Sequence, residues 1–340
     1  MSATIRDVAR RAGVSTATVS RVLNGTCPVH EDKRRLVLDA SRALGYTPNL
    51  VARSLLSKKT GGLGVLLPFV GAEFFSEFLT GLDEAAQETG FFLMISTSHR
   101  HTDEFDAAMQ AMDKRVDGMV IMAPELQPRD AASISETKGP VVFVNTYVDD
   151  PAFDVINFDN YGGGYALTQH LLGLGHRRIA LIKGPVHARD AEERTRGYRA
   201  AMAEAGFADT SRLEYQGEYT REGGYGAARV LLCATPRPTA IVAANDYCAI
   251  GVMRALHEAG IAMPEEMAVA GFDGIGSTQY TLPPLTSVHV PMREIGYRAI
   301  RRLAECLENE ERAEPPLRHV TPVELVVRKS TASPAEGGDG

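Results

Sequence analysis

Small polar side chains and one arginine share a face in the stretch from residue 16 to residue 24. The apolar residues around it form two short helical patterns, which Gly13, Val14 and Ser15 separate. The positions left facing outward on the second pattern are Thr16, Ala17, Ser20, Arg21 and Asn24. A guanidinium can pair with guanine through two hydrogen bonds, and small side chains can approach a base edge or a thymine methyl group. This face therefore predicts a helix that reads bases in the major groove of DNA.

The elements that would hold this face are typical of a helix-turn-helix. Apolar residues at positions 5, 8, 9 and 12 mark the first helix, and those at 19, 22 and 23 mark the second. Gly13 suits the left-handed conformation that ends a helix, and the Ser15 hydroxyl can cap the next one. A third pattern, from His30 to Leu44, places Leu36 and Ala40 toward the same small core.

Charge is distributed unevenly along the chain. Residues 1–60 hold eleven Lys or Arg against four Asp or Glu, a net charge of +7, whereas the whole chain carries −7. The remaining residues therefore carry −14. Because a basic segment attracts phosphate and an acidic one does not, this asymmetry favours DNA binding by the head over a surface helix pair with no partner.

Length and composition exclude several classes of protein. The chain has 340 residues, 44% of them hydrophobic and 23% charged, which suits a short head and a large folded body. It has no apolar run long enough to cross a bilayer and no export signal, so we expect a cytoplasmic protein with no membrane partner. The cysteines lie too far apart for a metal motif, and we expect free thiols at Cys27, Cys233, Cys248 and Cys306.

The sequence has no catalytic motif. It lacks GxxxxGKS/T, GxSxG and HExxH, and its glycine clusters at 162–164 and 223–226 do not fit a dinucleotide fingerprint. His99 and His101 could form a metal pair or face a ligand, although an exposed loop is favoured. We therefore expect a protein that is not an enzyme and has no cofactor and no metal.

The segment from Asn49 to Gly62 has two interpretations. Pro48 and the Gly-Gly pair confine it to about ten helix-capable residues, too few for a stable helix alone in water. It could become helical on DNA, with Ala52 and Leu55 in the minor groove and Leu55 wedged between base pairs. It could equally be a flexible linker, and periodicity does not decide between the two.

From Gly62 on, short apolar runs alternate with helical patterns. Strands are expected at 63–68, 91–97, 118–122, 141–144, 154–158, 178–183, 213–216, 240–243 and 268–272, and helices at 76–89, 165–174, 192–205, 223–233 and 249–259. Such alternation predicts an α/β body with parallel sheets covered on both faces. A weak repeat, in which residues 63–90 resemble residues 179–206, predicts two lobes facing one another across a cleft at the carboxyl ends of the strands.

Several motifs resemble those of one family, in register from residue 4 to about residue 328. They lie at 4–9, 17–24, 45–49, 174–180, 244–246 and 270–273. These segments resemble LacI/GalR-family transcriptional regulators, and the head motif is the most specific of them. The resemblance implies an all-α helix-turn-helix head and a two-lobed α/β body like periplasmic sugar-binding proteins, with two parallel doubly wound sheets. It also implies a homodimer and a hinge helix that forms on the operator.

The resemblance implies limits for each domain. Residues 1–47 would be the DNA-binding domain and 48–61 the hinge helix and linker, because residues 51–55 look like the family's hinge and so favour minor-groove insertion of Leu55. The effector-binding and dimerisation domain would be 62–329. Its N-lobe would comprise about 62–160 and 291–328, and its C-lobe about 161–290. The small and polar composition of residues 330–340 predicts a disordered tail.

The resemblance also implies roles for individual residues. Thr16, Ala17 and Arg21 would read the bases of a pseudo-palindromic operator, with Ala52 and Leu55 in the minor groove. The effector cleft would be lined by Phe74, Phe75, Phe78, Asn145, Arg194, Tyr219, Asn245 and Asp273. Carboxylates, amides and a guanidinium can bind vicinal hydroxyls, and aromatic rings pack on a sugar ring. We therefore expect a repressor of carbohydrate-utilisation genes with a sugar-type effector. The alternative is a regulator controlled by a purine, a nucleoside or a protein partner.

The residues taken alone leave simpler roles open. Periodicity favours core packing for the three phenylalanines, Arg194 could lie on a solvated helix start, Asn245 could be a helix cap and Asp273 part of a turn. The chain also departs from the family, because no Asn-Pro precedes Phe74 and Phe75 and because Gly274 replaces a frequent second Asp. These departures leave the ligand open. No leucine heptad follows residue 328, so no tetramer of that type is expected.

Overall fold

The computed structural model describes residues 3–24, 29–46, 59–98, 102–126, 134, 137, 139–309 and 315–334. The chain forms two compact units, Met1–Gly61 and Gly62–Gly340, which we call the head and the body. Each is described by itself. The predicted insertion residues Ala52 and Leu55 lie outside the described residues, as do Cys27, His99 and His101.

The head contains the predicted helix-turn-helix. Its helices are α1 (Ile5–Ala12), α2 (Thr16–Asn24) and α3 (Glu31–Ala43). Gly13 has φ +64° and ends α1 in the left-handed conformation, and the Ser15 hydroxyl accepts a hydrogen bond from the Thr18 N–H at 3.2 Å. The core contains Val8, Val19 and Val37, each fully buried. Leu36 was expected inside and is 50% exposed, because Val37 takes the inward position on α3.

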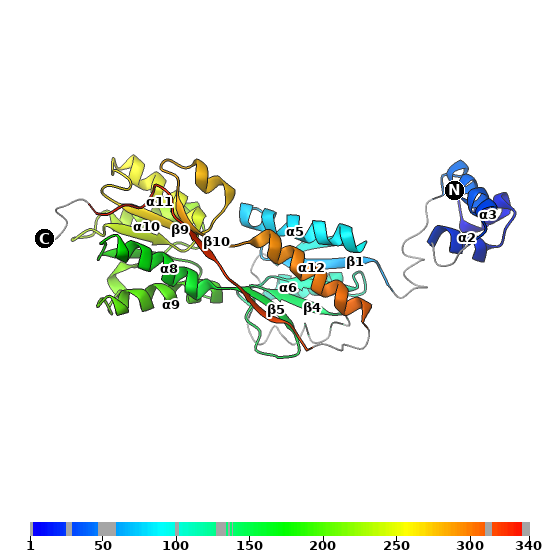
Figure 1. Cartoon of the computed structure of the whole chain (residues 1–340), viewed down its shortest axis with the longest axis horizontal. Helices are drawn as coiled ribbons and strands as arrows, with labels where there is room; N and C mark the ends of the chain where they lie inside the picture. The colour runs from blue at the N-terminus through cyan, green and yellow to red at the C-terminus, as the bar shows by residue number, and fades with distance from the viewer. Residues whose placement is uncertain are drawn as a thin grey trace. The chain divides into compact units, whose positions relative to one another are not determined.

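The first lobe of the body is built on a six-stranded sheet. Its order is β11-β5-β4-β3-β1-β2, and all its pairs are parallel. The strands are β1 (Gly62–Leu67), β2 (Phe92–Thr97), β3 (Gly118–Ile121), β4 (Val141–Val144), β5 (Asp154–Phe158) and β11 (Arg318–Thr321). Helices α5 (Glu73–Thr89) and α12 (Met292–Glu308) pack together on one face, and α6 (Thr102–Met112) packs on the other (Figure 1). The continuous burial of β1, β3 and β4 is typical of a parallel sheet covered on both faces.

The second lobe repeats this plan. Its sheet order is β12-β10-β9-β8-β6-β7, so the first five strands in each lobe follow the same order, and the predicted internal repeat is confirmed. The strands are β6 (Ile179–Lys183), β7 (Glu214–Gln216), β8 (Ala240–Ala243), β9 (Ala268–Asp273), β10 (Thr286–His289) and β12 (Glu324–Val326). The helices are α8 (Asn160–Gly173), α9 (Arg189–Glu204), α10 (Arg221–Leu231) and α11 (Asp246–Glu258). The predicted two-lobed α/β body is therefore confirmed, and among the described strands β10 and β12 form the one antiparallel pair.

Close backbone contact joins α5 to α12. A Cβ on Gly81 would lie 1.8 Å from the Arg293 carbonyl oxygen, and one on Gly296 would lie 2.4 Å from the Phe78 carbonyl oxygen. Glycine at these two positions lets the helices approach, so the start of α12 is fixed against the first lobe. The chain passes between the lobes after β5, after β10 and after β11.

Two predicted boundaries differ from the structure at the C-terminus. The N-lobe was expected to include residues 291–328, yet β12 pairs with β10 and so belongs to the second lobe. The tail was expected to be disordered from residue 330, yet Ser330 is fully buried and its hydroxyl donates to the Val269 carbonyl at 2.6 Å. Strand β9 of the second sheet supplies partners for this segment, which sequence patterning alone does not reveal. Residues 335–340 lie outside the described residues.

Candidate functional site

The outer face of α2 carries the predicted DNA-reading residues. Thr16, Ala17 and Arg21 are exposed on this helix, and Ser20 is partly buried. The buried side of α2 packs against the head core through Val19, so the polar face is turned away from the rest of the head. Asn24 ends the helix, and its side chain lies outside the described residues. This face can enter a major groove and offer one guanidinium and short polar groups to base edges.

A second polar cluster lies in a cavity of about 50 Å³ between the two lobes of the body. Six of the eight residues predicted to bind an effector come to it from the carboxyl ends of strands or from the loops and helix starts beyond them, and Arg194 comes from α9. The lining includes the predicted Phe74, Phe75, Asn145, Arg194, Tyr219, Asn245 and Asp273, and also Phe69, Asp190 and Tyr247.

Phe78 does not line this cavity, so its prediction as a ligand contact is wrong. Its side chain is fully buried in the hydrophobic core of the body. Phe78 lies one helical turn beyond Phe74 and Phe75, on the buried side of α5. The core-packing role that periodicity favoured is the one observed for Phe78. Phe75 is also buried but keeps an edge at the cavity.

A chain of hydrogen bonds crosses the cleft. The Asn145 amide of the first lobe donates to Asp190 at 3.1 Å, and the Asn160 amide donates to the Asn145 side-chain oxygen at 3.1 Å. Arg194 then donates from Nε to the Asn160 side-chain oxygen at 2.9 Å and from a terminal nitrogen to Asp273 at 3.2 Å. All five side chains are buried. The protein's own groups therefore satisfy one another where a ligand would bind.

Arg194 is the centre of this chain. It is 4% exposed, donates to the Ala244 carbonyl at 2.6 Å and lies over the Phe272 ring at 3.8 Å. A buried guanidinium with a carboxylate, two oxygen acceptors and an aromatic face is held in one orientation. Its alternative role on a solvated helix start is excluded by this burial.

The carboxylates around Arg194 are electrostatically perturbed. Burial raises the pKa of Asp273 to about 7, with the Arg194 charge acting in the opposite direction. Burial and the charge of Asp273 raise the pKa of Asp246 well above its ordinary value. Asp246 is fully buried and accepts from the Ser287 hydroxyl at 2.6 Å and from the Ile275 N–H at 2.9 Å. Paired buried acids of this kind mark a candidate functional site.

The backbone is strained at the same place. Asn145, Glu218, Tyr219 and Asp273 have φ values of +45°, +56°, +58° and +109°, in a region that residues with a side chain rarely adopt. Three of these four line the cavity. Strained backbone that clusters at one cleft is a recognised feature of ligand sites.

Tyr219 lines the cavity next to Arg194. Its ring lies 5.4 Å from the Arg194 guanidinium carbon, and a Cβ on Gly184 would lie 2.4 Å from the ring, so glycine is needed there. Burial raises the pKa of its hydroxyl well above the ordinary value. Asn245 caps α11 by accepting from the Cys248 N–H at 2.9 Å, and its amide donates to the Tyr219 carbonyl at 3.3 Å. Asn245 is thus both the helix cap that the residues allowed and a support for the tyrosine loop.

A polar clasp joins the lobes at one end of the cleft. The Glu73 carboxylate, at the start of α5, accepts from the Ser277 N–H at 3.1 Å and from the Ser277 hydroxyl at 2.8 Å. The Glu73 N–H donates to the Tyr247 hydroxyl at 3.0 Å. Elsewhere in the cleft the Arg189 N–H of α9 donates to the Pro124 carbonyl of the first lobe at 3.1 Å. These bonds hold the body closed around the cavity.

The sequence did not predict several residues of this site, and four of them lie at helix starts. Asp190, Asn160, Tyr247 and Glu73 all lie in or beside the first turn of a helix, where amphipathic periodicity is weakest. Asp190 had one usable signal, since it stands four residues before Arg194 and shares its helical face.

Across the described parts of the chain, no helix is long and apolar enough to span a membrane, and no three His, Cys, Asp or Glu side chains are grouped to hold a metal.

Comparisons with known proteins agree with this geometry. Residues 4–49 match the family described as bacterial regulatory proteins of the lacI family, and residues 168–331 match a periplasmic binding protein-like domain. A transcriptional repressor named PurR from Glaesserella parasuis is 35% identical over 337 residues, covering 96% of this chain and 98% of that protein. The PurR repressor of Mannheimia succiniciproducens is 32% identical over 331 residues, covering 96% of this chain and 98% of that protein.

Solved structures are similar over the whole chain. The lac repressor dimer bound to operator and the anti-inducer ONPF superimposes with a TM-score of 0.88 at 28% identity, covering 98% of this chain and all of that one. The regulator CelR in complex with cellobiose gives a TM-score of 0.73 at 30% identity, covering 96% of this chain and 99% of that one. The matches thus span both the head and the body.

Proposed function

The chain belongs to the LacI family of bacterial regulatory proteins and is a DNA-binding transcriptional repressor, and on that basis we propose how its DNA affinity is controlled. The family consists of regulators and not of enzymes. A small molecule bound between the lobes would change their closure and thereby the affinity for operator DNA. The observation that carries this proposal is the buried hydrogen-bond chain from Asp190 to Asp273, which crosses the cleft and is centred on Arg194.

The size of the cavity supports a switch between two states of the body. About 50 Å³ holds a few water molecules, whereas small-molecule sites occupy roughly 300–1,000 Å³. An effector therefore has to move the Tyr219 ring or part the lobes. The effector can take the place of the internal hydrogen-bond partners of Asp190 and Arg194. Its binding free energy would therefore differ between the closed and the open body, as a switch requires.

We propose that the effector is a sugar or sugar derivative. Two carboxylates, a guanidinium and two carboxamides converge on the cavity, and Phe74 offers a ring face beside them. Such groups bind neighbouring hydroxyls with bidentate hydrogen bonds while the aromatic ring packs on C–H groups. The similar regulator CelR forms a complex with cellobiose, a sugar, which adds support for this class.

A purine or nucleoside is the second candidate. The PurR relatives, at 32% and 35% identity over nearly the whole chain, are the observation that favours it. Arg194 could donate to a purine carbonyl or ring nitrogen, Asp273 could accept from a ring N–H, and Phe74 could stack on the base. Both classes use the same residues, so direct binding has to decide between them.

We further propose that the repressor works as a homodimer on a pseudo-palindromic operator. The edge strand β2 leaves Phe92 and Ile95 about half exposed, and in the second lobe Tyr280 and Leu282 are 79% and 88% exposed. Apolar side chains on an edge strand and a loop are surfaces that a second copy can cover. Two heads would then place two α2 helices in successive major grooves, with Leu55 of the hinge segment wedged in the minor groove between them.

Calorimetry on the full-length protein tests the effector proposal. We expect one compound from a panel of sugars, sugar phosphates, purines and nucleosides to bind and to change affinity for operator DNA. Asn145→Ala should change the affinity for that compound, because it removes both a hydrogen-bonding group of the cavity and a bridge between the lobes, whereas Asp83→Asn on the exposed side of α5 should not. A compound that binds equally well to the Asn145 variant would refute the cleft as its site.

A further inference from the structure

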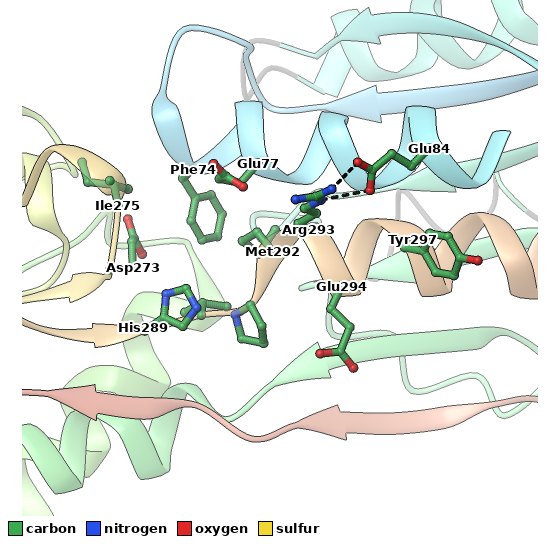
Figure 2. Close-up of a pocket in the computed structure, with 14 residues that line it drawn as sticks. Phe74, Glu77, Glu84, Asp273, Ile275, His289, Met292, Arg293, Glu294 and Tyr297 are labelled. Atoms are coloured by element: carbon green, nitrogen blue, oxygen red, sulfur yellow. Dashed lines mark hydrogen bonds and ion pairs between the residues drawn. The ribbon is translucent and has the colours of Figure 1, made fainter. Parts of the chain in front are cut away.

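A second and larger cavity lies beside the effector cleft. It has a volume of about 590 Å³ and is bounded by α5, the start of α12 and the ends of β9 and β10 (Figure 2). We call it the side groove. Its size falls within the range of small-molecule sites, unlike the cleft itself. None of the functions above makes use of it.

The side groove has an apolar floor between charged walls. Ile275, Val290 and Met292 are buried and form the floor, and the rings of Phe74 and Tyr297 are partly buried at its sides. Figure 2 shows Phe74 and Met292 facing the interior between the two helices. An apolar floor flanked by two aromatic rings favours a ligand with a flat or apolar portion.

The charge of the walls is acidic. Glu77 and Glu84 come from α5, and Glu294 comes from α12. Among the described residues of the lining, Arg293 is the only lysine or arginine. Its guanidinium donates hydrogen bonds to both carboxylate oxygens of Glu84, and the bond from Nε measures 2.9 Å. Glu294 pairs with Arg298 at 3.0 Å, whereas Glu77 is exposed and makes no hydrogen bond within the described residues. Because Glu84 and Glu294 already pair with arginines, the groove offers the Glu77 carboxylate to a cation, beside two aromatic rings that can also attract one.

The side groove and the effector cleft share a wall. Phe74 and Asp273 line both cavities, and the clasp residue Glu73 precedes Phe74 directly. A molecule seated against Phe74 in the groove would restrict the side chain that the cleft also uses. Because Phe74 lies in the first turn of α5 and Asp273 ends β9, the shared wall contains one residue from each lobe.

We propose that the side groove is a second ligand site, for a small organic cation with a protonated amine on an aromatic or apolar body. We further propose that binding there is coupled to the cleft through Phe74 and Asp273. The site itself is independent of the proposed effector, whereas the coupling rests on the proposed function of the cleft. Glu77 would pair with the ammonium group, and Phe74 and Tyr297 would flank the apolar body.

Tryptamine is a suitable probe because the chain contains no tryptophan, so the indole fluorescence comes from the ligand alone. Titration of the full-length protein should give saturable binding of tryptamine and none of indole-3-acetate, its anionic counterpart. Glu77→Gln should weaken tryptamine binding about threefold, as expected for loss of one exposed ion pair, and Glu77→Gln with Glu294→Gln more strongly. Asp83→Asn, on α5 but outside the groove, should have no effect.

Two results would overturn the site. Equal binding of the anionic and cationic probes would show that the groove carboxylates do not contact the ligand. Binding that is lost in Asn145→Ala but kept in Glu77→Gln would show that the amine binds in the cleft and not in the side groove. Coupling is read separately, by backbone hydrogen exchange with saturating tryptamine at Asn145, Asp190 and Tyr219, which line the cleft but not the side groove. Unchanged exchange there would refute the coupling and leave the site, and tryptamine binding would stand even if no effector bound the cleft.

Discussion

Replacing Glu73 by alanine should open the body, because it removes the clasp that joins the two lobes at one end of the cleft. The Glu73 carboxylate accepts both hydrogen bonds from Ser277, at 3.1 and 2.8 Å, and these bonds run from the first lobe to the second. The backbone bond from Glu73 N–H to the Tyr247 hydroxyl remains in the variant. The change therefore tests the side-chain part of the clasp alone.

The expected magnitude follows from the environment of these bonds. A hydrogen bond to a charged group contributes about 1.5–3 kcal/mol when buried. Glu73 and Ser277 are only partly buried, so we take about 1 kcal/mol for each bond and about 2 kcal/mol for the pair. Since 1.4 kcal/mol is a tenfold change, the ratio of closed to open body should fall about thirtyfold. Glu73→Gln keeps an uncharged acceptor, and a loss of about 1 kcal/mol would lower the ratio about fivefold.

The Arg189 amide is a reporter of closure that lies outside the clasp. As the first residue of α9, its N–H has no partner within the helix, and it donates instead to Pro124 across the lobes at 3.1 Å. Its hydrogen exchange therefore requires the lobes to part. Single-residue exchange measurements on the full-length protein should show about thirtyfold faster exchange at Arg189 in Glu73→Ala and about fivefold in Glu73→Gln.

Glu77→Ala is the matched control, because Glu77 lies one turn later on the same helix, is exposed and makes no contact with Ser277. It should leave exchange at Arg189 unchanged. If Glu73→Ala exposes the Ser277 amide but leaves Arg189 protected, the lobes are held together by other contacts, and the reasoning from the clasp is wrong.

Four further predictions concern the head, the hinge segment and the cleft. Arg21→Ala should cost roughly 1–3 kcal/mol in operator binding and relax base preference, and unchanged discrimination between operator variants would refute the assignment of α2. Leu55→Ala should reduce DNA bending with the dimer intact, so equal bend angles for variant and wild type would exclude the wedge. Asp273→Ala should abolish the effector response without loss of folding or operator binding, and a normal response would remove Asp273 from the site. Since burial raises the pKa of Asp273 from 3.8 to about 7, the folded body should lose stability as the pH rises across that interval, and melting temperatures of Asp273→Asn should depend less on pH there.

The sequence predicted the elements that burial controls better than those that a few polar contacts control. Strands β4 and β8 begin and end where their apolar runs predict, because a parallel strand covered on both faces is apolar throughout. Strand β5 also has its predicted bounds, although it contains Asp154 and Asn157. Strands β10, β11 and β12 were not predicted. Their residues are a mixture of polar and apolar types, and they form strands because an existing sheet edge offers hydrogen bonds to them.

Helix starts account for most of what the sequence did not reveal about the site. The helix expected from residue 165 begins at Asn160, and the one expected from residue 192 begins at Arg189. Periodicity identifies a helix from its apolar stripe, and the first turn of each of these helices has no such stripe. Asn160 and Asp190 lie in those first turns, so the residues that were placed outside the helices are also residues of the site. The left-handed conformation of Tyr219 had no signal at all, because it is imposed by the loop around it.

The closed cleft also limits what kind of ligand can act as an effector. In the closed body each side chain of the series Asp190, Asn145, Asn160 and Arg194 already has a protein partner, so a ligand gains only the difference between its own bonds and those it replaces. A ligand that bonds to residues of one lobe only would break the bridges at Asn145 and favour the open state. A ligand that bonds to both lobes would replace those bridges and favour closure. The sign of the response, release of DNA or tighter binding, is therefore set by whether the effector spans Asn145 and Arg194 at once, and compounds of increasing length within one chemical class should reverse it.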